Sequence, residues 1–173
     1  MTKKSLIIVN TGDGKGKTTA ALGMIMRNLG WDKKVAVIQF AKGGWETGEL
    51  RFLKKLGVEI IPTWEDKRWF EELPQEKRDE FTDKSLETAQ RLLSDETIDL
   101  LVLDEINIML RYGMITADQI LPLLKQRPAG MTVILTGRNA LPEILEAADL
   151  VSEIQDIKHP ARAGIKAQKG IEF

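Results

Sequence analysis

The chain has 173 residues, enough for one domain with a sizeable core. Charged residues make up 29% of it and the formal net charge is −1, which does not favour general binding to nucleic acid. The sequence has no cysteine, which excludes disulfides and thiolate metal sites, and its single histidine, His159, argues against a His-based triad. No apolar run approaches the ~18 residues of a membrane span and no signal-peptide pattern is present, so we expect a cytoplasmic protein without a membrane partner.

The first predicted strand, Ser5–Asn10, leads through a glycine-rich turn into a predicted helix over Thr18–Leu29. The turn reads Thr-Gly-Asp-Gly-Lys-Gly-Lys-Thr-Thr over residues 11–19. Its glycines let successive N–H groups face one point, Lys17 adds a positive charge there, and the Thr18 hydroxyl is a ligand for Mg²⁺. The dipole of the helix strengthens the attraction for anions. This segment therefore predicts a polyphosphate site.

The loop differs at one position from the usual phosphate-binding pattern, in which glycine stands five residues before the second glycine. Counting back from Gly16, that position is Thr11. We still expect the loop to bind phosphate, and the alternative is a glycine-rich turn without a ligand. The predicted contacts are Gly12, Asp13, Gly14, Lys15, Gly16, Lys17, Thr18 and Thr19.

Apolar strands and helical patterns alternate along the rest of the chain. Further strands are predicted at Val35–Phe40, Val58–Pro62, Leu100–Asp104, Thr132–Thr136 and Leu150–Ile154. Further helices are predicted at Gly48–Leu56, Gln75–Leu93, Thr116–Gln126 and Leu141–Ala148. Continuous apolar strands alternating with helices indicate an α/β fold of the P-loop NTPase-like type, with a mostly parallel central sheet and helices on both faces.

Two features stand out between these elements. Pro122 predicts a kink or an early irregularity within the helix that begins near Thr116. The longest irregular segment, Thr63–Pro74, is expected to be a loop. Aromatic side chains in the expected loops would either form a wall for a flat ligand or close over the core, and they are Trp45, Trp64, Trp69 and Phe70.

Ligands of such sheets bind at the carboxyl ends of the strands, where a second set of polar residues is expected. Asp104 and Glu105 end an apolar strand, and one of them should face the metal while the other faces nucleotide or second substrate, unless the strand ends between them. Arg138 follows the next strand and is suited to pair with phosphates. Lys42 follows the second strand in a flexible Gly-Gly loop and can face a ligand. The alternatives are a solvated strand end for the acids and a plain turn for Arg138.

The C-terminal segment from Lys158 onward carries a cluster of positive charge and the only histidine. Its apolar residues and two glycines indicate an ordered tail packed on the body, able to supply cations to an anionic substrate. The segment is short for a nucleic-acid-binding arm.

Over nearly its whole length the chain resembles the P-loop type of ATP:corrinoid adenosyltransferase. Five blocks carry the resemblance: residues 11–21, residues 39–43 with 48–49, residues 102–105, residues 136–138 and residues 148–173. The first block occurs in many NTPases, whereas the last is far more specific to this family. The resemblance implies one domain, 1–173, in which residues 151–173 are a family-specific tail.

The reaction implied by the resemblance is transfer of the 5′-deoxyadenosyl group of ATP to the Co(I) centre of a corrinoid, with release of triphosphate, in adenosylcobalamin synthesis or salvage. Mg²⁺ or Mn²⁺ is implied as cofactor, and a reductase or flavoprotein electron donor and a second copy in a homodimer as partners. Lys17, Thr18 and Glu105 would be catalytic, and Thr18, Asp104 and Glu105 would hold the metal. Further contacts to the substrates are implied for Gln39, Lys42, Trp69 and Arg138.

The chain departs from the family pattern in two ways. Family members commonly begin with a longer charged arm that folds over the active site, whereas here the first strand is predicted almost at residue 1. Trp69 matches the tryptophan that presses on the corrinoid in the family, but the phenylalanine expected before it has no clear counterpart. Two other readings stay open: a P-loop ATPase or kinase acting at the γ-phosphate, with Glu105 as base, and a non-catalytic nucleotide- or corrinoid-binding regulator.

Overall fold

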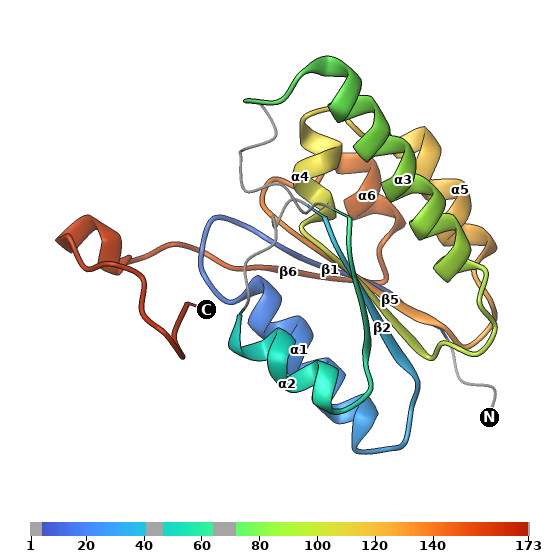
Figure 1. Cartoon of the computed structure of the whole chain (residues 1–173), viewed down its shortest axis with the longest axis horizontal. Coiled ribbons are helices and arrows are strands. Elements are labelled where there is room, and N and C mark those ends of the chain that lie inside the picture. Colours follow the sequence, from blue (N-terminus) through green and yellow to red (C-terminus); the bar gives the residue numbers. More distant parts are fainter. Residues whose placement is uncertain (1–4, 41–46, 64–71, 173) are drawn as a thin grey trace.

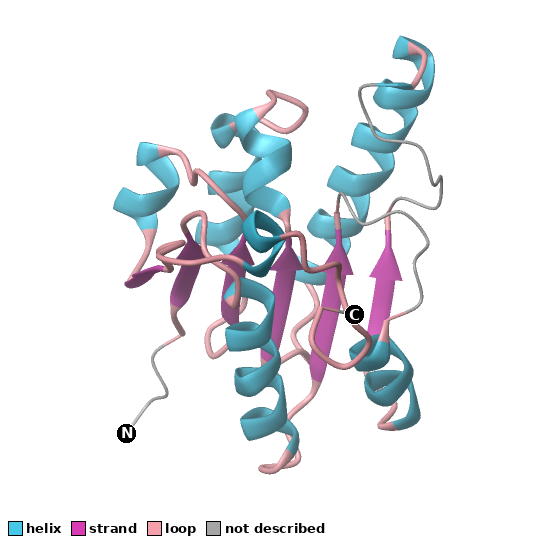
Figure 2. Cartoon of the chain, turned by 90° about the vertical axis from the view of Figure 1, so that its left-hand side faces the viewer, coloured by secondary structure: helices cyan, strands magenta, loops and turns pink. Residues whose placement is uncertain are grey.

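The computed structural model of the chain describes residues 5–40, 47–63 and 72–172 (Figure 1). Six strands in these residues form one parallel sheet in the order β3-β2-β4-β5-β1-β6, and Figure 2 shows them running in one direction. The strands are β1 (Ile7–Thr11), β2 (Val35–Gln39), β3 (Glu59–Pro62), β4 (Leu100–Asp104), β5 (Thr132–Thr136) and β6 (Leu150–Glu153). All their carboxyl ends therefore meet at one edge, where the chain places the phosphate loop.

Helices cover both faces of the sheet. One face carries α1 (Lys17–Leu29) and α2 (Gly48–Lys55), and the other carries α3 (Gln75–Leu93), α4 (Ile106–Arg111), α5 (Ala117–Gln126) and α6 (Pro142–Ala147) (Figure 1). Because side chains alternate along a strand, Ile8 packs toward α1 and α2 while Val9 packs toward the other four helices. Every residue of β1, β2 and β4 is buried, which explains why these strands are apolar on both faces.

The expected α/β fold is confirmed, and three predicted elements have the observed bounds: Leu100–Asp104, Thr132–Thr136 and Gln75–Leu93. The short helix α4 was not predicted, because its six residues are too few to show a helical period. Helix α5 runs through Pro122 as one element. Its first turn is closed by Gln119, whose side-chain oxygen accepts from the Thr116 N–H at 2.9 Å.

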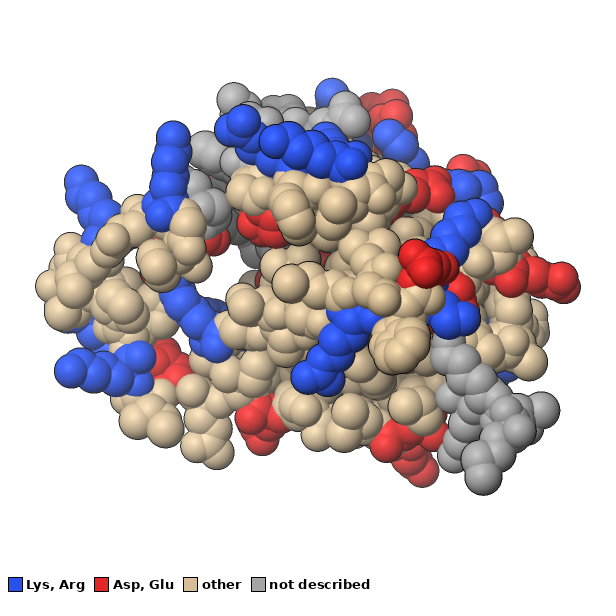
Figure 3. Space-filling model, turned by 90° about the horizontal axis from the view of Figure 1, so that it is seen from below, with Lys and Arg blue, Asp and Glu red and all other residues tan. Residues whose placement is uncertain are grey.

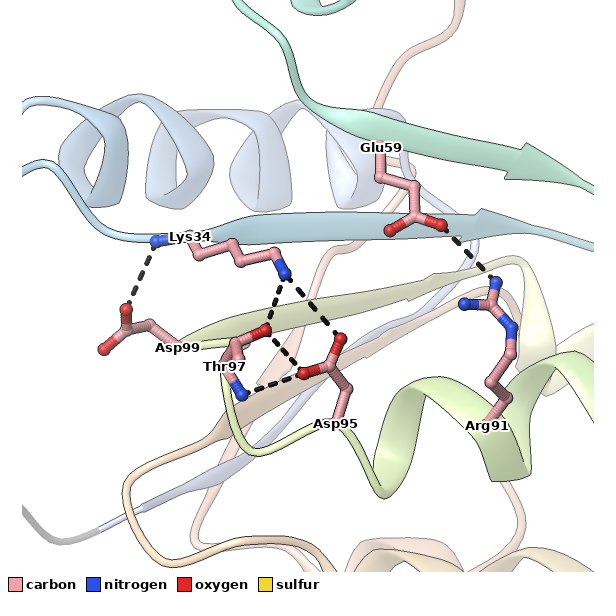
Figure 4. A network of polar contacts seen from close by, with 6 residues as sticks. All are labelled: Lys34, Glu59, Arg91, Asp95, Thr97 and Asp99. Carbon is pink, nitrogen blue, oxygen red and sulfur yellow. Dashed lines mark hydrogen bonds and ion pairs between the residues drawn. The ribbon is translucent and has the colours of Figure 1, made fainter.

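The amino-terminal edge of the sheet, opposite the phosphate loop, is held by exposed polar contacts (Figure 4). Lys34 donates its N–H to Asp99 at 3.2 Å, and its ammonium lies 3.7 Å from Asp95. The hydroxyl and the N–H of Thr97 both donate to Asp95 and lower the pKa of that carboxyl. Exposed ion pairs stabilise a fold only slightly, so we assign these contacts to fixing the turn before β4.

Beyond β6 the tail, residues 154–172, first contacts the loop before α1 through Ile154, then leaves the body and projects beside the sheet, and its end returns to Lys15 through Glu172 (Figure 1). This tail contains a 3₁₀ helix, η2 (Pro160–Ala163), which the His159 side chain caps by accepting from the Ala161 N–H at 3.1 Å. The expectation that the tail packs along the body is wrong for most of its length, since residues 160–171 are all exposed. Its Lys and Arg side chains form the positively charged lobe at the left of Figure 3. Within the described residues, no helix has the length and apolar character needed to cross a membrane.

Candidate active site

The phosphate loop, residues 12–16, lies between β1 and α1 and is crossed closely by the chain leaving β6. The N–H of Gly14 donates to the Ile154 carbonyl oxygen at 2.7 Å, and the N–H of Ile154 donates to the Thr11 carbonyl oxygen at 2.9 Å. A Cβ on Gly12 would come within 2.4 Å of the Ile154 oxygen, and one on Gly14 within 2.5 Å of the Gln155 oxygen. Gly12 also has φ of 94°, a conformation that side chains disfavour. Two of the loop glycines are therefore needed for close main-chain packing as well as for curvature.

Lys17 is the buried cation of the loop, with only 8% of the residue exposed. Its ammonium donates to the Gly14 carbonyl oxygen at 2.6 Å, so the side chain folds back over the loop. That position puts the positive charge where the N–H groups of a phosphate loop bind their anion. Lys15, in contrast, points to the tail and lies 2.9 Å from Glu172.

A hydrogen-bonded network joins the loop helix to two neighbouring strands. The hydroxyls of Thr18 and Thr136 both donate to Asp104 Oδ1, at 2.9 and 2.8 Å, and Asp104 is only 1% exposed. The Thr136 hydroxyl also accepts from the Glu105 N–H at 2.9 Å. The carboxylate is therefore fixed in orientation before any ligand arrives.

The oxygens of Thr18 and Asp104 fit the requirements of Mg²⁺, a hard cation that is commonly held by one or two carboxylates and by phosphates of the substrate. No group of three or more His, Cys, Asp or Glu side chains in the described part of the chain could hold a metal by itself. The donor set therefore suits an ion that shares its coordination with a bound polyphosphate.

Glu105 has a left-handed conformation, with φ of 64°, because β4 ends at Asp104 and α4 begins at Ile106. The strand thus ends between Asp104 and Glu105. The alternation of side chains along a strand therefore does not place these two carboxylates on opposite faces of the sheet. Glu105 lines a cavity of about 540 Å³ together with the phosphate loop, Arg138 and the tail residues 170–172. A second cavity, of about 410 Å³, lies beside the loop and is lined by Asp13, Arg138 and Arg162 of the tail, among others.

The structure brings most of the predicted residues together. Residues 14–19, Glu105 and Arg138 line the larger cavity, and Asp13 lies beside it. Gln39 pairs in register with Asp104 on the neighbouring strand, and both line a narrow pocket with Thr18. Two predicted residues, Lys42 and Trp69, lie outside the described residues, as do Trp45, Trp64 and Phe70.

Sequence reasoning missed several residues of this region. Asn107 was detectable as a lone polar residue in the apolar run from Ile106 to Leu110. Glu172 carried no signal, because its contact with Lys15 depends on the return of the tail to the loop. The pKa of the Glu172 carboxyl is lowered by two hydrogen bonds that it accepts. The larger effect comes from the Lys15 ammonium and the smaller from the Gln168 N–H.

A phosphate loop at the carboxyl edge of a parallel sheet, with a buried lysine and a fixed Thr–Asp pair, defines a nucleotide-binding protein of the P-loop NTPase-like fold. The model of the family described as ATP:corrinoid adenosyltransferase BtuR/CobO/CobP matches residues 3–173. The chain therefore belongs to the ATP:corrinoid adenosyltransferase family and is a transferase of that class.

Curated relatives agree with this assignment. A corrinoid adenosyltransferase from Sinorhizobium sp is 45% identical over 176 residues, covering 99% of this chain and 81% of the relative. A corrinoid adenosyltransferase from Escherichia coli K12 is 41% identical over 174 residues, covering 99% and 87%. Another from Salmonella typhimurium LT2 is 40% identical over 179 residues, with the same coverage. These similarities do not favour an ATPase or kinase acting at the γ-phosphate.

Proposed function

We propose that this chain transfers the 5′-deoxyadenosyl group of ATP to the Co(I) centre of a corrinoid, in adenosylcobalamin synthesis or salvage. In this reaction the cobalt–carbon bond forms with the electron pair of Co(I). The bond between C5′ and the triphosphate oxygen breaks, and triphosphate leaves with the electron pair of that broken bond. The single observation that carries the proposal is the buried Lys17 ammonium over the phosphate loop, in a chain that matches the family throughout.

The phosphate loop is the proposed site of the leaving triphosphate. Negative charge builds up on this group in the transition state, and the loop N–H groups and the Lys17 ammonium would stabilise it there. Contacts along residues 12–19 and from Arg138 would fix the direction in which C5′ faces the cobalt. This role is supported by the cavity that the loop and Arg138 share.

Mg²⁺, when bound between Thr18, Asp104 and the phosphates, would neutralise part of the triphosphate charge. The fixed hydrogen bonds of Asp104 support this assignment, since they aim its carboxylate at the loop helix. We assign Glu105 to the same side of the site, as a further metal ligand or a carboxylate facing the substrates. Mn²⁺ carries the same charge and prefers the same oxygen donors, so it is the expected substitute.

Corrinoid binding is assigned to the loops that follow β2 and β3. Gln39, the last residue of β2, would contact the substrates at the carboxyl edge of the sheet. Lys42 and Trp69 are the proposed contacts within them, and both lie outside the described residues. Aromatic side chains would exclude water from the reduced cobalt and so protect the nucleophile.

We further propose that one domain, 1–173, acts as a homodimer in the cytoplasm, with a reductase or flavoprotein as electron donor. Exposed apolar side chains support self-association, among them Val151 in β6, 42% exposed, and Ile157 in the tail, 87% exposed. Sedimentation at several protein concentrations tests the dimer. A protein that stays monomeric at the concentration of the assay would contradict it.

The experiment that tests the proposed reaction is incubation of the protein with ATP, Mg²⁺ and chemically reduced cob(I)alamin. We expect the light-sensitive spectrum of an alkylated cobalt and one triphosphate for each corrinoid converted. Reactions without Mg²⁺, and reactions with cob(II)alamin in place of cob(I)alamin, are the controls. Release of phosphate or ADP without alkylated cobalt would refute the proposal.

A further inference from the structure

Asn107 is a fully buried polar residue of α4, two positions after Glu105. Its Nδ2 donates to the Gly137 carbonyl oxygen at 3.1 Å and so joins α4 to the turn after β5. Its Oδ1 is buried as well and has no hydrogen-bond partner among the described residues. A buried amide oxygen without a partner lowers stability, so stability alone does not account for an asparagine at this position.

Gly137 lies between Asn107 and the carboxylate of Glu105. A Cβ on Gly137 would come within 3.0 Å of Asn107 Cβ and within 3.2 Å of Glu105 Oε2. Its φ of 127° is also a conformation that side chains rarely adopt. A residue larger than glycine is therefore disfavoured at position 137. The Glu105 carboxylate lies against Gly137, and Asn107 holds the carbonyl group of Gly137.

The Gly137 carbonyl belongs to the peptide group that links this glycine to Arg138. A hydrogen bond that fixes this carbonyl also fixes the main chain from which the Arg138 side chain starts. Arg138 lines both cavities beside the phosphate loop. The orientation of the Gly137–Arg138 peptide group therefore sets the point from which the Arg138 side chain extends toward the two cavities.

We propose that Asn107 is a positioning residue for nucleotide binding, which holds the Gly137–Arg138 peptide so that the Arg138 guanidinium faces the phosphates beside Glu105. Asn107 acts through Gly137 and does not itself touch the nucleotide. The inference rests on the proposed role of Arg138 as a phosphate contact.

The test compares Asn107→Ala, Arg138→Ala and the double variant in steady-state assays with ATP and cob(I)alamin. We expect Asn107→Ala to raise the KM for ATP about tenfold, the effect of one lost hydrogen bond, and to leave the KM for cob(I)alamin unchanged. In the Arg138→Ala background the same substitution should have no further effect on the KM for ATP, because the residue through which Asn107 acts is gone.

Asn28→Ala is the matched control. Asn28 also donates its Nδ2 to a main-chain carbonyl, that of Met24, at 2.9 Å, but near the end of α1 that lies away from the loop. Its loss should leave both KM values unchanged. Asn107→Leu fills the same space without a donor, and it replaces Asn107→Ala if circular dichroism shows that the alanine variant is unfolded.

An unchanged KM for ATP in the folded Asn107 variant would overturn the inference. The inference would also be overturned if the Asn107 substitution raised the KM for ATP by the same factor in the wild-type and the Arg138→Ala backgrounds. The effect would then not pass through Arg138. If Arg138→Ala itself left the KM for ATP unchanged, the assignment of Arg138 would fail, and the inference with it.

Discussion

The Thr18 hydroxyl donates to Asp104 Oδ1 at 2.9 Å and so connects the first turn of α1 with the end of β4, 86 positions later in the chain. The hydroxyl of Thr136 occupies the same carboxylate oxygen at 2.8 Å. The proposed metal ligands are therefore oriented by contacts between three elements, the helix α1 and the strands β4 and β5. Preorganisation of this kind reduces the rearrangement that ligand binding requires.

Replacing Lys17 by alanine should abolish turnover while the fold remains. The ammonium is the buried cation nearest to the proposed leaving group, and loss of one such contact lowers kcat by about 10²–10³-fold. The measurement is the rate of cobalt alkylation, with circular dichroism as the check on folding. Lys34→Ala is the control, because that exposed lysine pairs with Asp95 at the opposite edge of the sheet and its loss should cost far less. Near-normal activity of Lys17→Ala would refute the assigned role.

Asp104→Asn should raise the concentration of Mg²⁺ needed for half-maximal activity by at least about tenfold. The amide keeps the shape of the side chain but removes the negative charge that Mg²⁺ requires. A titration of activity against Mg²⁺ measures this shift. Asp99→Asn makes the same change at the opposite edge of the sheet and should leave the titration where it is. An unchanged titration for Asp104→Asn would remove this residue from the metal site.

Gly12→Ala should destabilise the protein by about 1–3 kcal/mol, because its Cβ meets the Ile154 carbonyl oxygen in a backbone conformation that alanine disfavours. Gly23→Ala is the control, since its Cβ would meet nothing within 4 Å in the interior of α1. That substitution should stabilise the protein by about 0.5–1 kcal/mol. Urea unfolding measures both changes. If both substitutions changed the free energy of unfolding in the same direction, the close packing at Gly12 would be contradicted.

The tip of the tail should detach from the loop in acid. The pKa of Glu172 is lower when its carboxylate accepts from Lys15 and from the Gln168 N–H than its usual value of 4.5. A carboxyl with a lowered pKa holds its contact at neutral pH and loses it as pH falls through the lowered value. The amide NMR signal of Gln168 should therefore titrate with a midpoint below 4.5. Glu172→Gln should abolish the transition, and a midpoint above the usual value would count against the contact.

The body of the fold was predictable because buried parallel strands are apolar throughout and helices between them end at recognisable residues. Gly57, which directly follows the predicted helix Gly48–Leu56, has φ of 75°, as is typical of a glycine that ends a helix. The turn between β1 and α1 was equally predictable, because its glycines lie within nine consecutive residues between an apolar strand and a helix. Helix α4 was missed, since it has only six residues and follows β4 after a single intervening residue, which is too short for a helical period to show in the sequence.

Contacts between distant segments were not predictable in the same way. Nothing in the sequence near Gly12 and Gly14 indicates that Ile154 and Gln155 cross them, because that contact depends on β6 pairing with β1. The left-handed conformation of Glu105 was also hidden, since glutamate has no preference for it. Local patterns predict local structure, whereas these features are imposed by the packing of the whole sheet.

The tail meets the phosphate loop at both of its ends, through Ile154 at Gly14 and through Glu172 at Lys15. The exposed stretch between these two contacts is accessible to solvent and is connected at both ends to the proposed triphosphate-binding loop. Since the sequence has no cysteine, a fluorophore attached through Lys166→Cys would sit at one position of this exposed stretch, outside the proposed ATP site. Its signal would follow displacements of the loop while the reaction proceeds, with no reporter inside the site.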